Sequence, residues 1–199
     1  MNQLTKAQEE YFKNSKLRDE NDNLKVVYHG TKAEFDCFSN VKKSIIENLK
    51  AGFFFTESKS EADSFGKDKG GKTLEVYLNL ENPLDLNKDG GYALLDKYMK
   101  DCFPCVNWQQ EHICTNKFKD YLYKKGFDSI ITFDMIIAFE PNQIKSVNNL
   151  YPTKDDNFIN NEEDYFKNSS LEDKLEAAEK KAASYNLSIK QQSKDELEL

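Results

Sequence analysis

Apolar and polar positions along the chain follow two periods, and the shorter period marks the strands. Short apolar runs bounded by turn residues predict strands over residues 24–28, 52–56, 73–80, 129–132 and 135–139. In the longest run every second residue is apolar, which is typical of a strand with one buried face. The last two runs are separated only by Phe133 and Asp134, so we expect a hairpin there. Pro141 then ends the second strand of this pair.

The longer period, with apolar residues three or four positions apart, predicts the helices. We expect helices over residues 3–21, 58–65, 92–102, 107–125 and 171–187, and a short helix or turn over 44–50. Ser58 or Ser60 can cap the second helix, and Glu61 in its first turn suits the helix dipole. Gly126 is a natural C-cap for the fourth.

The chain divides into three parts at its polar, turn-rich stretches. Residues 1–23 are an N-terminal helix that ends in a turn signal, and residues 24–150 are the main domain. Residues 151–199 are a linker followed by a C-terminal helix rich in Ala, Glu and Lys. We therefore expect one folded domain between two helical ends.

One stretch of the chain occurs twice. Residues 9–17 read Glu-Glu-Tyr-Phe-Lys-Asn-Ser-Lys-Leu, and residues 163–171 read Glu-Asp-Tyr-Phe-Lys-Asn-Ser-Ser-Leu. In a helix the Tyr-Phe pair and the leucine can face one side. We interpret the repeat as a duplicated linker helix that docks on the domain, with its origin at a module boundary.

Composition and charge exclude some classes of function. The 199 residues are 38% hydrophobic and 32% charged, which gives a modest core and a very polar surface. No run approaches the ~20 apolar residues of a membrane span, and the first ten residues lack the apolar core of a signal peptide. We therefore expect a cytosolic protein with no membrane partner. The net charge of −7 argues against binding nucleic acid by bulk electrostatics.

The four cysteines raise the question of a metal site. Without an export signal we expect reduced thiols. Cys102, Cys105, His112 and Cys114 have the spacing C-x2-C-x6-H-x-C, which is compatible with a Cys3His zinc site. The spacing is not that of a standard finger, and cysteine and histidine are also common in cores, so we favour buried thiols and predict no metal.

A histidine and a glycine stand together at the end of the first strand. The run Val26-Val27-Tyr28-His29-Gly30-Thr31 is followed about twenty residues later by Gly52-Phe53-Phe54-Phe55-Thr56, and Phe65 lies eleven residues after Phe54. An imidazole beside a glycine at a strand end suggests a site that holds a flat polar ligand. Taken singly, the phenylalanines indicate core and the histidine a packing residue.

The ordered series resembles the NAD-binding pattern of ADP-ribosyltransferases of the diphtheria-toxin and poly(ADP-ribose) polymerase branch. That pattern has a His-Gly-Ser/Thr step, a Gly-x-Tyr-Phe strand and a second aromatic about eleven residues later. The chain is similar in particular to the transferase modules of phage and mobile-element polyvalent proteins. Two further matches are Arg-Asp-Glu-Asn at residues 18–21 and Phe-Glu-Pro-Asn-Gln-Ile-Lys-Ser at residues 139–146. The resemblance covers roughly residues 11–150.

The resemblance implies a fold and a reaction. The fold would be α+β, an ADP-ribosyltransferase-like split β-sandwich of two small antiparallel sheets around a cleft, with flanking helices and a C-terminal helical tail. The cleft would lie between the strands of Tyr28 and Phe54. The reaction would be mono-ADP-ribosyl transfer from NAD to a macromolecular acceptor, a protein, by a phage or toxin effector.

The resemblance also implies roles for residues. The backbone of Gly30 would hold the nicotinamide carboxamide, because glycine allows a close approach. His29 would hydrogen-bond the adenosine ribose as a neutral imidazole. Phe54 and Phe65 would sandwich the nicotinamide, each with about 1 kcal/mol of stacking and cation–π energy. The Ser60 hydroxyl could reach the carboxamide. The full expected NAD-binding set is His29, Gly30, Thr31, Phe54, Phe55, Ser60 and Phe65.

The catalytic acid is where the chain departs from the family. The family has a glutamate five residues before the acidic residue that ends the last strand, and counting back from Glu140 gives Met135. Asp134 is the neighbouring carboxylate. Because successive residues of a strand point to opposite faces of the sheet, its side chain faces the site only if a bulge or the hairpin turn changes its direction. Asp128, before the preceding strand, is another candidate. We take Asp128, Asp134 and His29 as the catalytic candidates. A catalytically degenerate NAD-binding or protein-interaction module is the alternative.

Overall fold

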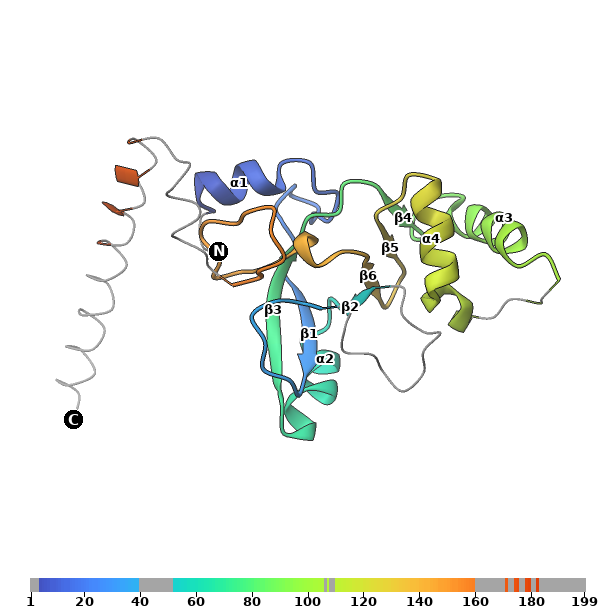
Figure 1. Ribbon diagram of the computed structural model, residues 1–199, viewed down its shortest axis with the longest axis horizontal. Helices are drawn as coiled ribbons and strands as arrows, with labels where there is room; N and C mark the ends of the chain where they lie inside the picture. The colour runs from blue at the N-terminus through green and yellow to red at the C-terminus, as the bar shows by residue number, and fades with distance from the viewer. Residues whose placement is uncertain are drawn as a thin grey trace. The chain divides into compact units, whose positions relative to one another are not determined.

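The computed structural model describes residues 4–39, 52–105, 107 and 110–159, and positions 171, 174, 175, 178, 179 and 182 of the C-terminal part. Residues 1–161 form one compact unit and residues 162–199 a second (Figure 1). The elements described below belong to the first unit. The predicted turn over 44–50 and most of the second repeat copy lie outside the described residues.

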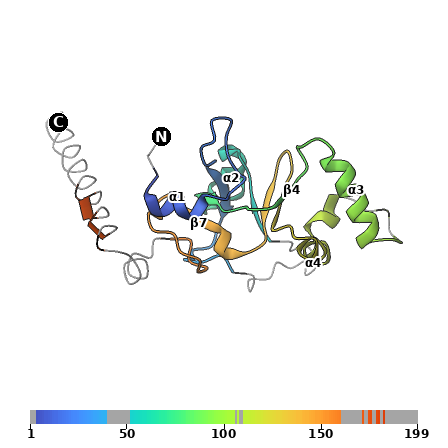
Figure 2. The same cartoon turned by 90° about the horizontal axis from the view of Figure 1, so that it is seen from above.

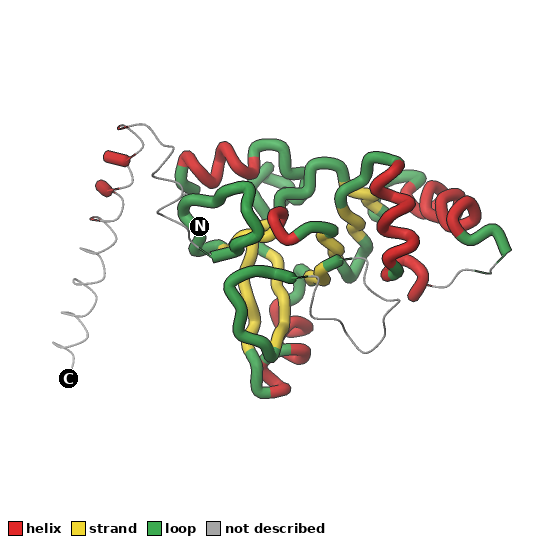
Figure 3. Tube along the Cα trace, in the orientation of Figure 1, coloured by secondary structure: helices red, strands yellow, loops and turns green. Residues whose placement is uncertain are grey.

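Two small sheets carry the fold. The first has the order β1-β3-β7, with β1 (Val27–Thr31), β3 (Lys72–Leu78) and β7 (Ile144–Ser146), and its pairs are antiparallel. The second has the order β2-β6-β5-β4, with β2 (Phe53–Phe55), β6 (Ile136–Ala138), β5 (Ser129–Ile131) and β4 (Pro83–Asp85). Figure 3 shows these strands in yellow. The predicted α+β class with two small sheets is therefore confirmed.

One pairing differs from the expectation of antiparallel sheets. Strand β4 pairs with β5 in parallel. A parallel pair needs a long crossover, and the chain makes it through α3 (Gly91–Cys102) and α4 (Asn116–Lys124). The predicted hairpin is confirmed, because β5 and β6 are antiparallel and the Thr132 amide donates to the Met135 carbonyl at 2.8 Å.

The remaining helices begin at polar caps. Thr5 and Gln8 form a capping box at α1 (Lys6–Phe12), and the Ser58 hydroxyl caps α2 (Lys59–Phe65). The predicted helix over 3–21 is wrong after Phe12, because the chain becomes extended and the Lys16 amide donates to the Leu80 carbonyl at 2.7 Å. The predicted helix over 107–125 is broken. It consists of a 3-10 segment (Gln110–Cys114) and α4, which Thr115 caps.

Alternation along the strands divides the apolar residues between two cores. Ile136 and Ala138 of β6 join residues of the first sheet in one cluster, while Ile137 joins residues of α3 and α4 in another. In Figures 1 and 2, α3 and α4 lie on the side of the second sheet away from β1. Both faces of the second sheet are therefore buried. Within the described segments, no helix is long and apolar enough to cross a membrane.

Candidate functional site

Strand β1 has one paired edge and one edge that is mostly open. Along the first it pairs with β3; on the other, Tyr28 exchanges two backbone hydrogen bonds with Thr56, of 2.9 and 3.0 Å. Residues two apart on a strand direct their backbone groups to the same edge, so the N–H and C=O of Gly30 also face this side. Among the described residues, neither group has a hydrogen-bond partner there. One donor and one acceptor are thus open to a ligand.

Helix α2 packs directly on β1 at this glycine. A Cβ added to Gly30 would lie 2.1 Å from the Ala62 carbonyl oxygen and 2.8 Å from the Gly66 nitrogen. No side chain fits in that space. Phe65, in the last turn of α2, has its Cβ 2.9 Å from the same point, and its side chain is 64% exposed. The structure therefore brings Gly30 and Phe65 together, as the resemblance implies.

A hydrogen bond to the backbone defines the tautomer of His29. Its Nδ1 lies 2.8 Å from the Phe54 carbonyl oxygen. A carbonyl can only accept, so Nδ1 donates, and in the neutral ring Nε2 is then an acceptor. Burial lowers the pKa of His29 below its ordinary value, which favours the neutral ring at pH 7. Nε2 has no hydrogen-bond partner among the described residues.

Two phenylalanine rings pack against this imidazole. The ring centroids of Phe38 and Phe55 lie 5.2 and 5.5 Å from that of His29. Phe55 is buried, so it contacts the histidine rather than offering an open face to a ligand. Phe54 points to the opposite face of β2, where it packs against the cluster under α3 and α4. A nicotinamide held between Phe54 and Phe65 stays a prediction.

The hydroxyl groups predicted for the site lie close to the start of α2 or the end of β1. Ser60 is exposed, and its Oγ lies 3.0 Å from that of the helix cap Ser58. The Thr31 hydroxyl accepts from the Ala33 amide at 3.1 Å. Neither contact tests binding to NAD. The sequence reasoning missed Glu61, whose carboxylate accepts from the Thr56 hydroxyl at 2.7 Å beside the junction of β1 and β2.

The two candidate aspartates lie at opposite ends of β5, at least about 13 Å apart along the strand. Asp128 accepts hydrogen bonds from the amides of Glu81 and Asn82 and from the Ser129 hydroxyl, at 2.7, 3.1 and 2.6 Å. It holds the segment that leads into β4. The structure does not bring the two carboxylates together, so they are alternatives.

The hairpin end of β6 carries the other candidate. Asp134 is exposed in the two-residue turn, where it accepts from the Thr132 hydroxyl at 2.8 Å. Met135, at the position of the family's acid, is half-buried and packs against the same cluster as Phe54. Since Phe55 pairs with Ile136, Met135 is opposite Thr56. This end of β6 is therefore next to the junction of β1 and β2.

Comparison with known proteins bears on this arrangement. A family model described as "ADP-Ribosyltransferase in polyvalent proteins" matches residues 19–154, more than half of the 199 residues. The chain belongs to this ADP-ribosyltransferase family. The search of curated proteins finds no match. Among solved structures, one titled "Crystal structure of an anti-CRISPR protein" is similar with a TM-score of 0.36 and 13% identity, covering 57% of this chain and 88% of that one.

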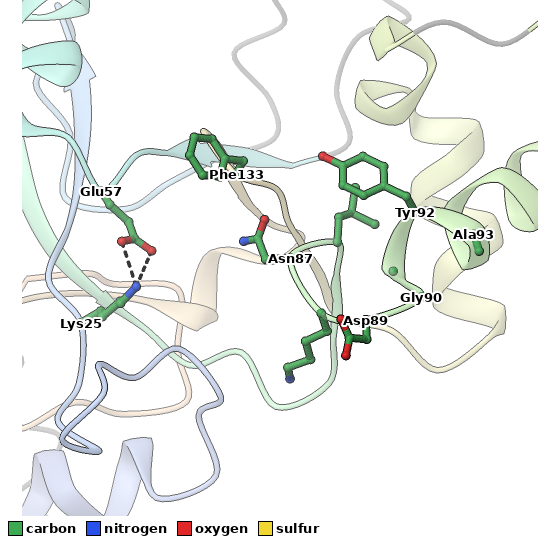
Figure 4. A pocket seen from close by; sticks show the side chains of 11 residues that line it. Lys25, Glu57, Asn87, Asp89, Gly90, Tyr92, Ala93 and Phe133 are labelled. Carbon is green, nitrogen blue, oxygen red and sulfur yellow. Dashed lines mark hydrogen bonds and ion pairs between the residues drawn. The ribbon is translucent and has the colours of Figure 1, made fainter.

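The ADP-ribosyltransferase domain has a pocket of about 910 Å³ beside the hairpin (Figure 4). It is lined by the ion pair of Lys25 and Glu57, whose atoms are 2.7 Å apart, by the start of α3, and by two exposed aromatics. These aromatics are Phe133, 91% exposed in the hairpin turn, and Tyr92, 60% exposed. Sequence reasoning missed this pocket, because its walls come from segments far apart in the chain.

The thiols of the domain do not assemble a metal site in the part of the chain that the structure describes. There, no three side chains of His, Cys, Asp or Glu are grouped so as to hold a metal ion. Cys102 is buried, Cys105 is exposed, and both are free thiols. Burial raises the pKa of the Cys102 and Cys114 thiols above the ordinary value.

Proposed function

We propose that the chain binds NAD at the open edge of β1 and transfers one ADP-ribose unit to a protein. The observation that carries this proposal is the N–H and C=O of Gly30, without hydrogen-bond partners among the described residues, beside His29, whose Nδ1 is held by the Phe54 carbonyl. A carboxamide has both an amide donor and a carbonyl acceptor, so nicotinamide can pair with both backbone groups at once. Family membership supports NAD as the substrate.

His29 and Phe65 complete the binding half of the site. The free Nε2 of His29 accepts a hydrogen bond from a ribose hydroxyl of NAD. The exposed ring of Phe65, next to Gly30, stacks on the cationic nicotinamide. Nε2 of His29 has no hydrogen-bond partner among the described residues before NAD binds, which limits the reorganisation that binding requires.

The reaction breaks the bond between C1′ of the ribose and the nicotinamide nitrogen. Nicotinamide leaves with the electron pair, the ribose develops positive charge, and a nucleophile of the acceptor protein bonds to C1′ and loses its proton. A carboxylate near the ribose stabilises the developing charge. We assign this role to Asp134, since it lies at the hairpin end of β6 close to Thr56, whereas Asp128 is engaged by backbone amides.

A second candidate function is NAD binding without catalysis, or protein interaction through the same fold. Met135 favours it, because a thioether cannot stabilise a developing cation as the family's carboxylate does. With NAD binding but no catalysis, NAD would stabilise the chain and remain intact.

The two candidates are separated by incubating the chain with NAD labelled in the adenylate part and a bacterial lysate. The transferase predicts labelled protein and released nicotinamide, both reduced at least about tenfold by His29→Asn. His112→Asn, at the only other histidine, is the matched control and should leave transfer unchanged. A higher Tm with NAD but no label transfer or nicotinamide release supports the alternative. No effect of NAD of any kind contradicts both the transferase and the NAD-binding module, and favours protein interaction through the fold.

A further inference from the structure

The first copy of the sequence repeat docks on the first sheet through four of its nine residues. Phe12 and Leu17 are 1% and 5% exposed, and the Phe12 ring lies 5.7 Å from that of Tyr77. The Ser15 hydroxyl donates to the Leu78 carbonyl at 2.7 Å. The Tyr11 hydroxyl donates to the Asn142 carbonyl. We call the receiving residues the docking surface: Tyr77, Leu78, Leu80 and Asn142.

The second copy keeps every residue that makes these contacts. Residues 163–171 carry Tyr165, Phe166, Ser169 and Leu171 at the four docking positions. The two copies differ at only two positions, 10 against 164 and 16 against 170. In the first copy, both of these positions are exposed. The retained residues therefore include all four that contact the docking surface, together with three that are exposed in the first copy, Glu9, Lys13 and Asn14.

The second copy lacks the anchors that flank the first. Gln8 donates to the Asn149 carbonyl at 2.9 Å, and the Thr5 hydroxyl donates to the Leu150 carbonyl at 2.6 Å. Figure 2 shows α1, which follows Thr5, beside β7, in agreement with these contacts. The equivalent positions in the second copy hold Glu162 and Ile159. Within one molecule the first copy therefore holds the docking surface more firmly.

The one described residue of the second copy is exposed. Leu171 is 85% exposed, whereas its equivalent in the first copy is buried. Leu175, one helical turn further on, is 63% exposed. Both apolar residues are thus exposed within the second unit.

We propose that residues 163–171 of one molecule bind the docking surface of a second molecule, in place of that molecule's residues 9–17. The occupant is a second copy of this chain, because the retained positions match this surface residue by residue. The exchange is limited by release of the resident segment, which Thr5 and Gln8 hold. The proposal is independent of ADP-ribosyl transfer.

The test uses a fluorescent peptide of residues 161–173 and the full chain. Two variants loosen the resident segment: Thr5→Ala with Gln8→Ala, which leaves the docking surface intact, and Phe12→Ala. We expect saturable binding to at least one variant, and binding at least about tenfold weaker to the unaltered chain, whose surface is filled. A matched peptide with Phe166→Ala should bind at least about tenfold more weakly than the unaltered peptide.

Competition and self-association complete the test. An unlabelled peptide of residues 6–18 should displace the fluorescent one. In sedimentation, the Thr5→Ala/Gln8→Ala chain should self-associate with rising concentration, and adding Phe166→Ala should return it to monomer. Absence of saturable binding to both variants, equal binding of the two 161–173 peptides, or failure of the 6–18 peptide to compete would each overturn the proposal.

Discussion

At the scale of single residues, neighbouring backbone atoms fix the orientation of two groups, the His29 imidazole and the Gly30 backbone. The Phe54 carbonyl fixes the proton of His29 on Nδ1, and the pairing of Tyr28 with Thr56 directs the Gly30 backbone to the open edge. The sequence predicts His29 and Gly30 through their adjacency at a strand end. It does not reveal which edge of the strand stays open, because that depends on where β2 turns away.

Gly30→Ala should destabilise the protein by about 3 kcal/mol, because its methyl group would meet the Ala62 carbonyl at 2.1 Å and push α2 away from β1. Urea unfolding measures the loss. Gly70→Ala is the control: it meets no atom within 4 Å, and its positive φ of 78° should cost only about 1 kcal/mol. Equal losses would show that α2 does not need the glycine.

His29→Asn should weaken NAD binding at least about tenfold, because asparagine can donate to the Phe54 carbonyl but does not reach the place of Nε2. Calorimetric titration with NAD measures the affinity, with His112→Asn as control. If affinity is unchanged, Nε2 does not contact NAD.

The pH dependence of stability follows from the lowered pKa of His29. The unfolded chain takes up a proton near its ordinary pKa of about 6.5, while the folded chain resists protonation until lower pH. His29 therefore reduces stability as the pH falls below about 6.5, and this loss ends below the folded pKa. Unfolding at pH 7.5 and pH 5.5 should show a smaller difference for His29→Asn than for the unaltered chain. An equal difference in both chains would contradict the assignment.

At the scale of elements, strands with a clear apolar alternation or a marked turn can be predicted from the sequence, whereas the three-residue strands β4 and β7 cannot. Strand β3 shows its alternation clearly, and the β5–β6 hairpin is marked by its two-residue turn. Strand β1 begins at Val27 rather than Leu24, since Leu24 instead forms a bridge with Arg18. Strands β4 and β7 were missed, because each has only three residues, of which one in β4 and two in β7 are polar.

The proposed function assigns catalysis to Asp134 in the hairpin and a stabilising role to Asp128 at the start of β5. Asp134→Asn should lower ADP-ribosyl transfer at least about 100-fold and leave stability unchanged, because the residue is exposed. Asp128→Asn should lower stability by about 1–2 kcal/mol, since its carboxylate holds two backbone amides. Labelled-NAD transfer and urea unfolding of both variants decide this. The reverse pattern, with transfer lost only in a fully stable Asp128→Asn, would assign the acid to Asp128.

At the scale of the molecule, a buried lysine connects the last strand of the first sheet to the segment that follows it. Lys145 of β7 is fully buried and donates to the carbonyls of Asp155 and Asn157, both at 2.7 Å. It thus ties the segment after the sheet to the sheet itself. The sequence shows this residue only as part of a family motif. A lysine in a strand predicts an exposed side chain, and its hydrogen-bond partners lie ten and twelve residues further along the chain.

Lys145→Met should destabilise the folded unit by about 2–3 kcal/mol, because two half-buried carbonyls would lose their donor. Lys154→Met, at an exposed position, should change stability by less than about 0.5 kcal/mol. Thermal and urea unfolding measure both. A neutral Lys145→Met would show that packing, rather than these hydrogen bonds, holds the segment.

The family is thus readable from the sequence, and the proposed NAD-binding residues follow from the same motifs, while the position of the family's acid is held by Met135. The most direct test is a crystal structure of the chain with NAD. We predict the nicotinamide carboxamide within about 3 Å of both the N and the O of Gly30, and a ribose hydroxyl within hydrogen-bond reach of His29 Nε2. NAD bound elsewhere, or a carboxamide that contacts neither Gly30 group, would contradict the account.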